Sequence, residues 1–191
     1  MSRPVLQVVI ASTRPGRVGP AFARWFVDLA KQEDVFELEV VDLAEVDLPF
    51  LDEPHHPWLH RYVHQHTKDW SETVSRADAF VFITPEYNYG YNAVLKNALD
   101  FLHDEWADKP VGFLSYGGVA AGTRSVQQLK QVVTALRMVP VVEAVNVPFA
   151  AQLLDADREV RANDAMILGA EAMLRELVRF TVLLRQLPAA V

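Results

Sequence analysis

The sequence contains no cysteine among its 191 residues. Disulfides, thiolate-bound zinc, iron–sulfur clusters and a cysteine nucleophile are therefore all excluded. Basic residues are not in excess either, because 18 Lys and Arg stand against 25 Asp and Glu, a formal net charge of -7. Broad nucleic-acid binding needs basic surface that displaces counterions from phosphates, so we expect no nucleic-acid partner.

Long apolar runs are missing as well. Residues 1–12 lack the apolar region of a signal peptide, and no run approaches the roughly 20 residues that span a bilayer. We therefore expect no membrane association and a cytoplasmic location. The chain also has neither the glycine spacing G-x-G-x-x-G nor a Walker A lysine, which disfavours Rossmann-type dinucleotide binding and nucleoside-triphosphate chemistry.

What the chain does contain is a regular alternation of short apolar segments with segments of helical periodicity. The predicted strands are residues 5–11, 36–43, 80–83, 109–116 and 139–147, and the predicted helices are residues 19–32, 60–76, 91–106, 125–136 and 166–187. This alternation predicts a single α/β domain over residues 1–191, a doubly wound five-stranded parallel sheet with helices on both faces. The second strand alternates apolar and polar residues as an edge strand does, which fits the flavodoxin-like order 2-1-3-4-5.

The most apolar strand, residues 80–83, leads into the loop with the clearest binding character. It ends at Thr84 and Pro85, and three tyrosines follow within five residues, at 87, 89 and 91. Open α/β sheets bind ligands at the carboxyl ends of their strands. Flat tyrosine faces and backbone amides at that place suit a flat aromatic cofactor. The alternative is an aromatic loop at a subunit contact, where tyrosine is also enriched.

Two further loops follow strands whose carboxyl ends lie at the same edge of the predicted sheet. Residues 12–19 bring hydroxyls, backbone amides, a helix N-terminus and two arginines together, which is a natural phosphate cradle. The alternative there is a capped helix with solvated arginines. Residues 115–124 contain three glycines, which would let a ligand ring lie against bare backbone, whereas a plain strand-to-helix turn would need about one.

These loops resemble those of the NAD(P)H-dependent FMN reductase family, which includes bacterial quinone, chromate and azo-dye reductases. The resemblance is carried by Ser12-Thr13-Arg14 with Arg17, by PEYN at 85–88 with LKNALD at 95–100, and by SYGG at 115–118. It covers most of the chain, from about residue 5 to residue 145. It implies FMN as the cofactor and NADPH or NADH as the co-substrate.

The resemblance also implies which residues bind the cofactor. Those expected around the FMN phosphate are Ser12, Thr13, Arg14, Arg17, Val18 and Gly19. Those expected beside the isoalloxazine are Pro85, Glu86, Tyr87 and Asn88, with Ser115, Tyr116 and Gly117 on its other side. No residue is assigned as a catalytic acid or base, because the flavin itself supplies the redox chemistry.

The expected function is therefore transfer of a hydride from NAD(P)H through bound FMN to quinones, free flavin or a similar small-molecule acceptor. The family resemblance and the apolar stripes suggest a homodimer or homotetramer. Two alternatives stay open: a flavodoxin-like electron carrier that does not use pyridine nucleotides, and a non-enzymatic flavin-binding module. The arginines of the first loop count against the carrier, whose phosphate loops are typically rich in Ser, Thr and Gly.

A group of histidines, His55, His56, His60, His64 and His66, invites a metal interpretation. His60 and His64 are spaced i, i+4 in the predicted helix 60–76, which can place two imidazoles on one helix face. No H-E-x-x-H pattern accompanies them, and the segment reads as a solvated loop and helix. We predict no metal site.

Overall fold

The computed structural model describes residues 3–186 of the chain. Its five strands form one parallel sheet in the order β2-β1-β3-β4-β5, which confirms the predicted topology. The strands are β1 (Val5–Ile10), β2 (Glu37–Asp42), β3 (Ala79–Pro85), β4 (Pro110–Tyr116) and β5 (Val139–Val147). The single domain over residues 1–191 stays a prediction, because residues 1, 2 and 187–191 lie outside the described part.

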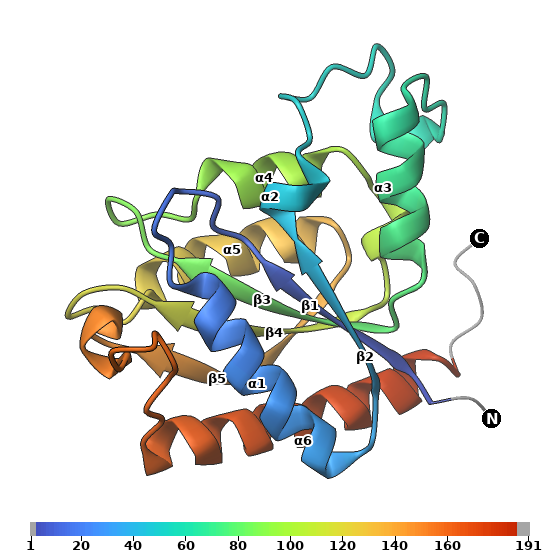
Figure 1. Cartoon of the computed structure of the whole chain (residues 1–191). Coiled ribbons are helices and arrows are strands. Elements are labelled where there is room, and N and C mark those ends of the chain that lie inside the picture. The colour runs from blue at the N-terminus through green and yellow to red at the C-terminus, as the bar shows by residue number, and fades with distance from the viewer. Residues whose placement is uncertain (1–2, 187–191) are drawn as a thin grey trace.

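Helices cover both faces of the sheet (Figure 1). One face carries α1 (Gly19–Glu33) and α6 (Asp164–Leu184), and the other carries α3 (Gln65–Ser75), α4 (Ala93–Asp100) and α5 (Thr123–Ala135). A short α2 (Leu43–Val46) follows β2, and three 3-10 turns occupy Pro57–Leu59, Asp104–Trp106 and Ala150–Leu153. Within residues 3–186 no helix is both long enough and apolar enough to cross a bilayer.

The central strand β3 is buried along its whole length. Val81 and Ile83 pack under α1 and α6, whereas Phe80 and Phe82 pack under the helices of the opposite face. The Phe80 ring lies 5.1 Å from that of Trp106, both being buried. A fully buried side chain of this size contributes about 1.5–3 kcal/mol to folding, which explains why this strand is continuously apolar.

The helix predicted over residues 60–76 begins only at Gln65, so the placement of His60 and His64 on one helix is wrong. His60 closes the preceding 3-10 turn with a φ of 50°, and His64 is the N-cap of α3. The carboxylate of Glu53 accepts hydrogen bonds from the N–H groups of Val63 and His64. An acidic side chain from an earlier loop thus stabilises the N-terminus of α3 at this point.

Other helix limits also differ from the prediction. The helix predicted over residues 91–106 begins at Ala93, because Asn92 is extended (ψ 147°), and ends at Asp100 before the separate 3-10 turn. The last helix begins at Asp164, with the Asn163 side chain as its N-cap. Its predicted end at residue 187 lies outside the described residues.

Lys109, just before β4, closes the C-terminal end of α3. Its ammonium donates hydrogen bonds to the carbonyls of Val74 (3.0 Å) and Ser75 (3.4 Å) and lies 5.7 Å from the centre of the Phe80 ring. Burial lowers the pKa of Lys109 from 10.5 to about 8. Between these values the unfolded chain binds more protons than the folded chain, so the free energy of unfolding must rise with pH there.

We therefore expect Lys109→Met to flatten this pH dependence. Between about pH 7.5 and about pH 9, the wild-type protein should gain on the order of 1 kcal/mol of unfolding free energy relative to the variant. Urea denaturation at the two pH values measures this gain. Lys31→Met, at a lysine whose side chain is 63% exposed, should keep the wild-type slope. A wild-type slope in Lys109→Met would contradict the assignment.

Candidate active site

The loops that follow β1, β3 and β4 lie at one edge of the sheet (Figure 1). Side chains and backbone tie them to one another. Asn92 Nδ2 donates to the Ala11 carbonyl (2.5 Å), which joins the first and second loops. The Tyr116 hydroxyl donates to Ser12 Oγ (2.9 Å), and the Glu86 N–H donates to the Tyr116 carbonyl (3.0 Å). The three loops therefore form one connected site.

The first loop turns back on itself between Arg14 and Arg17. The Arg17 N–H donates to the Arg14 carbonyl (3.1 Å), and Gly16 has a φ of 74°. Proline followed by a residue of positive φ is the central pair of a type II turn, and glycine tolerates that backbone without a Cβ clash. The sequence Pro15-Gly16 thus shapes the turn that leads into α1.

This turn leaves a set of backbone donors free. Among residues 3–186 no acceptor meets the N–H groups of Thr13, Arg14, Gly16, Val18 or Gly19. No described side chain caps the N-terminus of α1, and the first turn of this helix contains no acid. Free amides at the positive end of a helix are the donors that a phosphate dianion requires. The residues present therefore fit the phosphate of a mononucleotide.

The two arginines of this loop have different surroundings. Arg17 donates to both carboxylate oxygens of Asp42 (2.5 and 2.6 Å) and to the Ser12 carbonyl (2.6 Å). The hydrogen bonds to Asp42 raise the pKa of Arg17. Arg14 is exposed, and its guanidinium carbon lies 6.0 Å from the centre of the Tyr87 ring. Arg14 is thus the arginine whose charge faces outward, whereas Arg17 holds the loop onto the end of β2.

Ser12 and Tyr116 are buried braces beneath the loop. Ser12 has no exposed surface, and the Tyr116 ring stacks on Phe22 with centroids 5.6 Å apart. Burial raises the pKa of Tyr116 to about 12, so its hydroxyl stays protonated and donates to Ser12. Gly19 lies so close that a Cβ there would approach Ser12 Oγ to 2.7 Å. The side chains of Ser12 and Tyr116 face the protein interior. Their predicted contacts with the cofactor can therefore come only from their backbone atoms.

The second loop is a tight β-hairpin. Tyr87 and Gly90 exchange two backbone hydrogen bonds of 3.0 Å, and the residues between them, Asn88 and Tyr89, have φ angles of 49° and 72°. Two central residues of positive φ define a type I′ turn, in which asparagine is favoured. The hairpin presents Tyr87 (38% exposed) and Tyr89 (66% exposed) at the surface.

The hairpin is fastened to α5. The Glu86 carboxylate accepts from the Arg124 N–H (3.2 Å) and from Arg124 Nη1 (2.9 Å), and the same guanidinium lies 3.8 Å over the Tyr89 ring. Gln128 Nε2 donates to the Tyr89 carbonyl (3.0 Å). Only 9% of the Glu86 side chain is exposed, so its carboxylate serves this attachment. The predicted contact of Glu86 with the cofactor can therefore come only from its backbone.

In the third loop the glycines have separate roles. Gly122 has a φ of 81°, and a Cβ there would lie 2.7 Å from the Tyr116 nitrogen, so this position requires glycine. Ser115 is buried, and its hydroxyl donates to the Ala121 carbonyl (2.8 Å). Gly117 is partly exposed and Gly118 is exposed, with open space where the Cβ of Gly118 would stand. These two leave bare backbone at the edge of the site.

Comparison with known proteins agrees with this geometry. Residues 5–152 match the NADPH-dependent FMN reductase family. The chain belongs to this family. FMN is accordingly its cofactor, and NADH or NADPH is its electron donor. The match covers all three loops and ends just after β5.

Curated relatives and solved structures are consistent with this assignment. An NAD(P)H-dependent FMN reductase of Schizosaccharomyces pombe is 42% identical over 149 residues, which are 76% of this chain and 74% of that protein. An FMN-dependent NADPH-azoreductase of Staphylococcus aureus is 32% identical over 130 residues, 68% of this chain and 69% of that protein. The FerB flavoenzyme of Paracoccus denitrificans has the same fold, with a TM-score of 0.72 at 20% identity, covering 94% of this chain and 97% of that one.

Several residues that organise the site of this FMN reductase were not foreseen from the sequence. Asp42 at the end of β2 pairs with Arg17, and Arg124 pairs with Glu86. Asn92 is 3% exposed, and its Oδ1 has no hydrogen-bond partner among the described residues. Asn92 lies inside the helix predicted over residues 91–106, and its bond to the first loop depends on tertiary contacts that the sequence does not reveal.

Several of the histidines interact with carboxylates. Asp104 accepts hydrogen bonds from His60 (2.8 Å) and His103 (2.6 Å), which lower the pKa of Asp104. His66 lies 2.9 Å from Asp52. Across residues 3–186 no group of three or more His, Asp or Glu side chains is arranged to hold a metal ion. These histidines thus pair with acidic side chains, His66 from the first turn of α3 and His60 and His103 from the 3-10 turns and loops near it.

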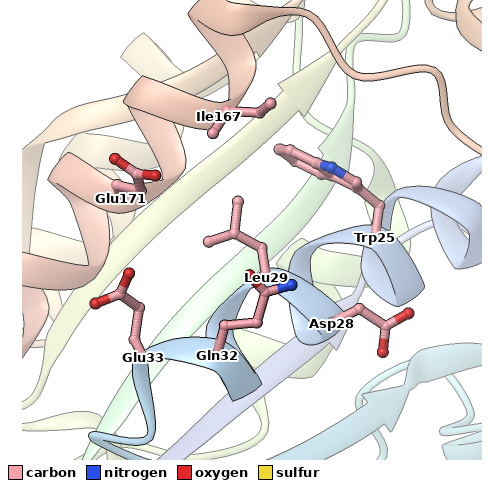
Figure 2. A pocket seen from close by; sticks show the side chains of 7 residues that line it. All are labelled: Trp25, Asp28, Leu29, Gln32, Glu33, Ile167 and Glu171. Carbon is pink, nitrogen blue, oxygen red and sulfur yellow. The ribbon is translucent and has the colours of Figure 1, made fainter.

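A separate hollow of about 270 Å³ lies between α1 and α6 (Figure 2). Trp25, Leu29 and Ile167 project toward it, with Glu33 and Glu171 on its rim. The residues that line it include three carboxylates and no basic side chain. This charge would repel a phosphate, so the hollow does not compete with the loops as the FMN site.

The close approach of Gly19 to Ser12 can be tested directly. Gly19→Ala places a Cβ 2.7 Å from Ser12 Oγ and 3.1 Å from Ile10 Cγ2, so the start of α1 or Ser12 must shift. We expect the Kd for FMN to rise about tenfold, equivalent to about 1.4 kcal/mol, because the free amides of the helix start move with it. Flavin fluorescence titration measures the change.

Gly169→Ala is the matched control, because its added Cβ would also be crowded, 3.1 Å from the Ala144 carbonyl oxygen, but in α6, which contributes no residue to the three loops. Its Kd for FMN should equal that of the wild type. An unchanged Kd in Gly19→Ala would show that the start of α1 does not hold the phosphate.

Proposed function

We propose that this FMN reductase passes electrons from NADH or NADPH to quinones, free flavin or similar small acceptors. The observation that carries the proposal is the set of free N–H groups at the uncapped start of α1, connected to an exposed tyrosine hairpin. The Staphylococcus aureus relative is an azoreductase, which supports a small conjugated acceptor. When bound, FMN would supply the redox chemistry of this transfer.

In this scheme the residues of the chain bind and orient the cofactor. The amides of Val18 and Gly19 and the guanidinium of Arg14 would hold the phosphate end of the cofactor. The hairpin carrying Tyr87 and the bare backbone at Gly117 border the ring. Arg14 also attracts anionic nucleotides toward a protein whose formal net charge is -7.

No protein side chain acts as a proton donor in this proposal. Tyr116 ends β4 within the site, but its hydroxyl is buried and donates to Ser12. Burial also raises its pKa to about 12, far above neutral pH. A general acid works best with a pKa near the working pH and within reach of the reacting atom, and Tyr116 meets neither condition.

We further propose that the protein is a homodimer or homotetramer in the cytoplasm. The segment between α2 and α3 exposes large apolar side chains, including Phe50 (84% exposed), Trp58 (62%) and Val63 (53%). Phe50 stands beside a hollow formed with Val94 and Asn97 of α4. Exposed apolar patches of this kind are typical of subunit contacts.

The proposal is tested by the absorbance spectrum of the purified protein and by its turnover. We expect one FMN per chain and steady oxidation of NADH or NADPH when a quinone, free FMN or an azo dye is added. Stopped-flow mixing with each nucleotide should bleach the flavin band. A flavin that stays oxidised would favour the electron carrier, and a protein that takes up no FMN and oxidises neither nucleotide would refute the proposal.

A further inference from the structure

A small hairpin beyond the family-matched region reaches back to the phosphate loop. Residues 153–161 follow β5, and Leu154 and Val160 form an antiparallel bridge. The Asp155 carboxylate accepts hydrogen bonds from the N–H groups of Asp157 and Glu159, which closes the turn. Figure 1 shows this segment beside the start of α1.

The tip of this hairpin contacts the first loop through Arg158. Arg158 Nη2 donates to the carbonyls of both Gly16 and Arg17, each at 3.1 Å. The neighbouring Glu159 pairs with Arg24 of α1 (3.0 Å), which holds the hairpin against the same helix. The loop and the helix that it leads into are thus both attached to residues 153–161.

These two bonds fix the direction of backbone amides. The carbonyl and the N–H of one trans peptide point in opposite directions, and the described residues contain no cis peptide. Because Arg158 holds the Arg17 carbonyl, the Val18 N–H on the same peptide points away from Arg158. The Arg17 N–H is used within the turn, but the Val18 N–H has no acceptor among the described residues.

The backbone conformation of Arg158 is energetically unfavourable. Its φ is 63°, in the left-handed region that favours glycine and costs other residues about 1 kcal/mol. A glycine would therefore suit the hairpin better than arginine does. The side chain, by contrast, supplies two hydrogen bonds and a positive charge to the loop.

We propose that Arg158 is a positioning residue that orients the phosphate loop toward the phosphate monoester of FMN. The inference rests on the proposed function, because it requires FMN at the start of α1. Arg158 does not touch the cofactor in this scheme. It acts through the carbonyls of Gly16 and Arg17, and so it should affect recognition of the phosphate alone.

The test compares FMN with riboflavin, which lacks the phosphate. Arg158→Gly should raise the Kd for FMN about 3- to 10-fold and leave the Kd for riboflavin unchanged, because only the phosphate loop is affected. The Tm should change little, since relief of the left-handed backbone offsets the two lost hydrogen bonds. Arg158→Lys keeps the charge but not the double contact, so it should restore the FMN affinity only in part.

Arg137→Gly is the matched control. Arg137 also has a positive φ (61°) and also pairs with a surface group, Asp108, but it follows α5 at the opposite end of the molecule from the phosphate loop. Its Kd for FMN should equal the wild-type value.

Three outcomes would overturn the role of Arg158: an unchanged FMN Kd in Arg158→Gly, an equal loss for FMN and riboflavin, or full restoration by Arg158→Lys. Failure of the wild-type protein to bind FMN would instead refute the proposed function.

Discussion

The start of α1 rests on a hydrogen bond between two buried hydroxyls. Tyr116 at the end of β4 donates to Ser12 after β1, and Gly19 packs against both. Because glycine lacks a Cβ, the helix can begin directly above this bond. Stacking of Tyr116 on Phe22 fixes the next turn of the helix as well. The free amides of the first loop thus owe their position to a contact that is hidden from the ligand.

The fold could be predicted because burial leaves a strong mark on the sequence. β3 is apolar from Ala79 to Ile83 since helices cover both of its faces, and β2 alternates since it lies at an edge. The ends of the helices were harder to predict, because they depend on hydrogen-bond partners that are distant in the chain. Glu53, in an earlier loop, accepts hydrogen bonds from the N–H groups of Val63 and His64 just before α3. The sequence pattern of residues 60–64 does not reveal this contact.

The convergence of the three loops could also be predicted, since the carboxyl ends of parallel strands share one edge. The partners of their side chains could not. The family resemblance places Arg17 and Glu86 in loops that bind the cofactor. In the structure, however, Arg17 forms an ion pair with Asp42, and Glu86 forms one with Arg124. Each of these pairs joins two different elements of the fold, so sequence spacing gives no sign of it. Sequence reasoning thus identifies which loops matter more readily than which atoms in them are free.

An open sheet also has a consequence for the behaviour of the protein in concentrated solution. Its outer strands, β2 and β5, carry backbone groups that another extended chain could pair with, which is a route to aggregation. Glu37 and Glu39 place negative charge along β2, and Pro140 removes one donor from β5. These residues discourage strand-by-strand growth between molecules at the two open edges of the sheet.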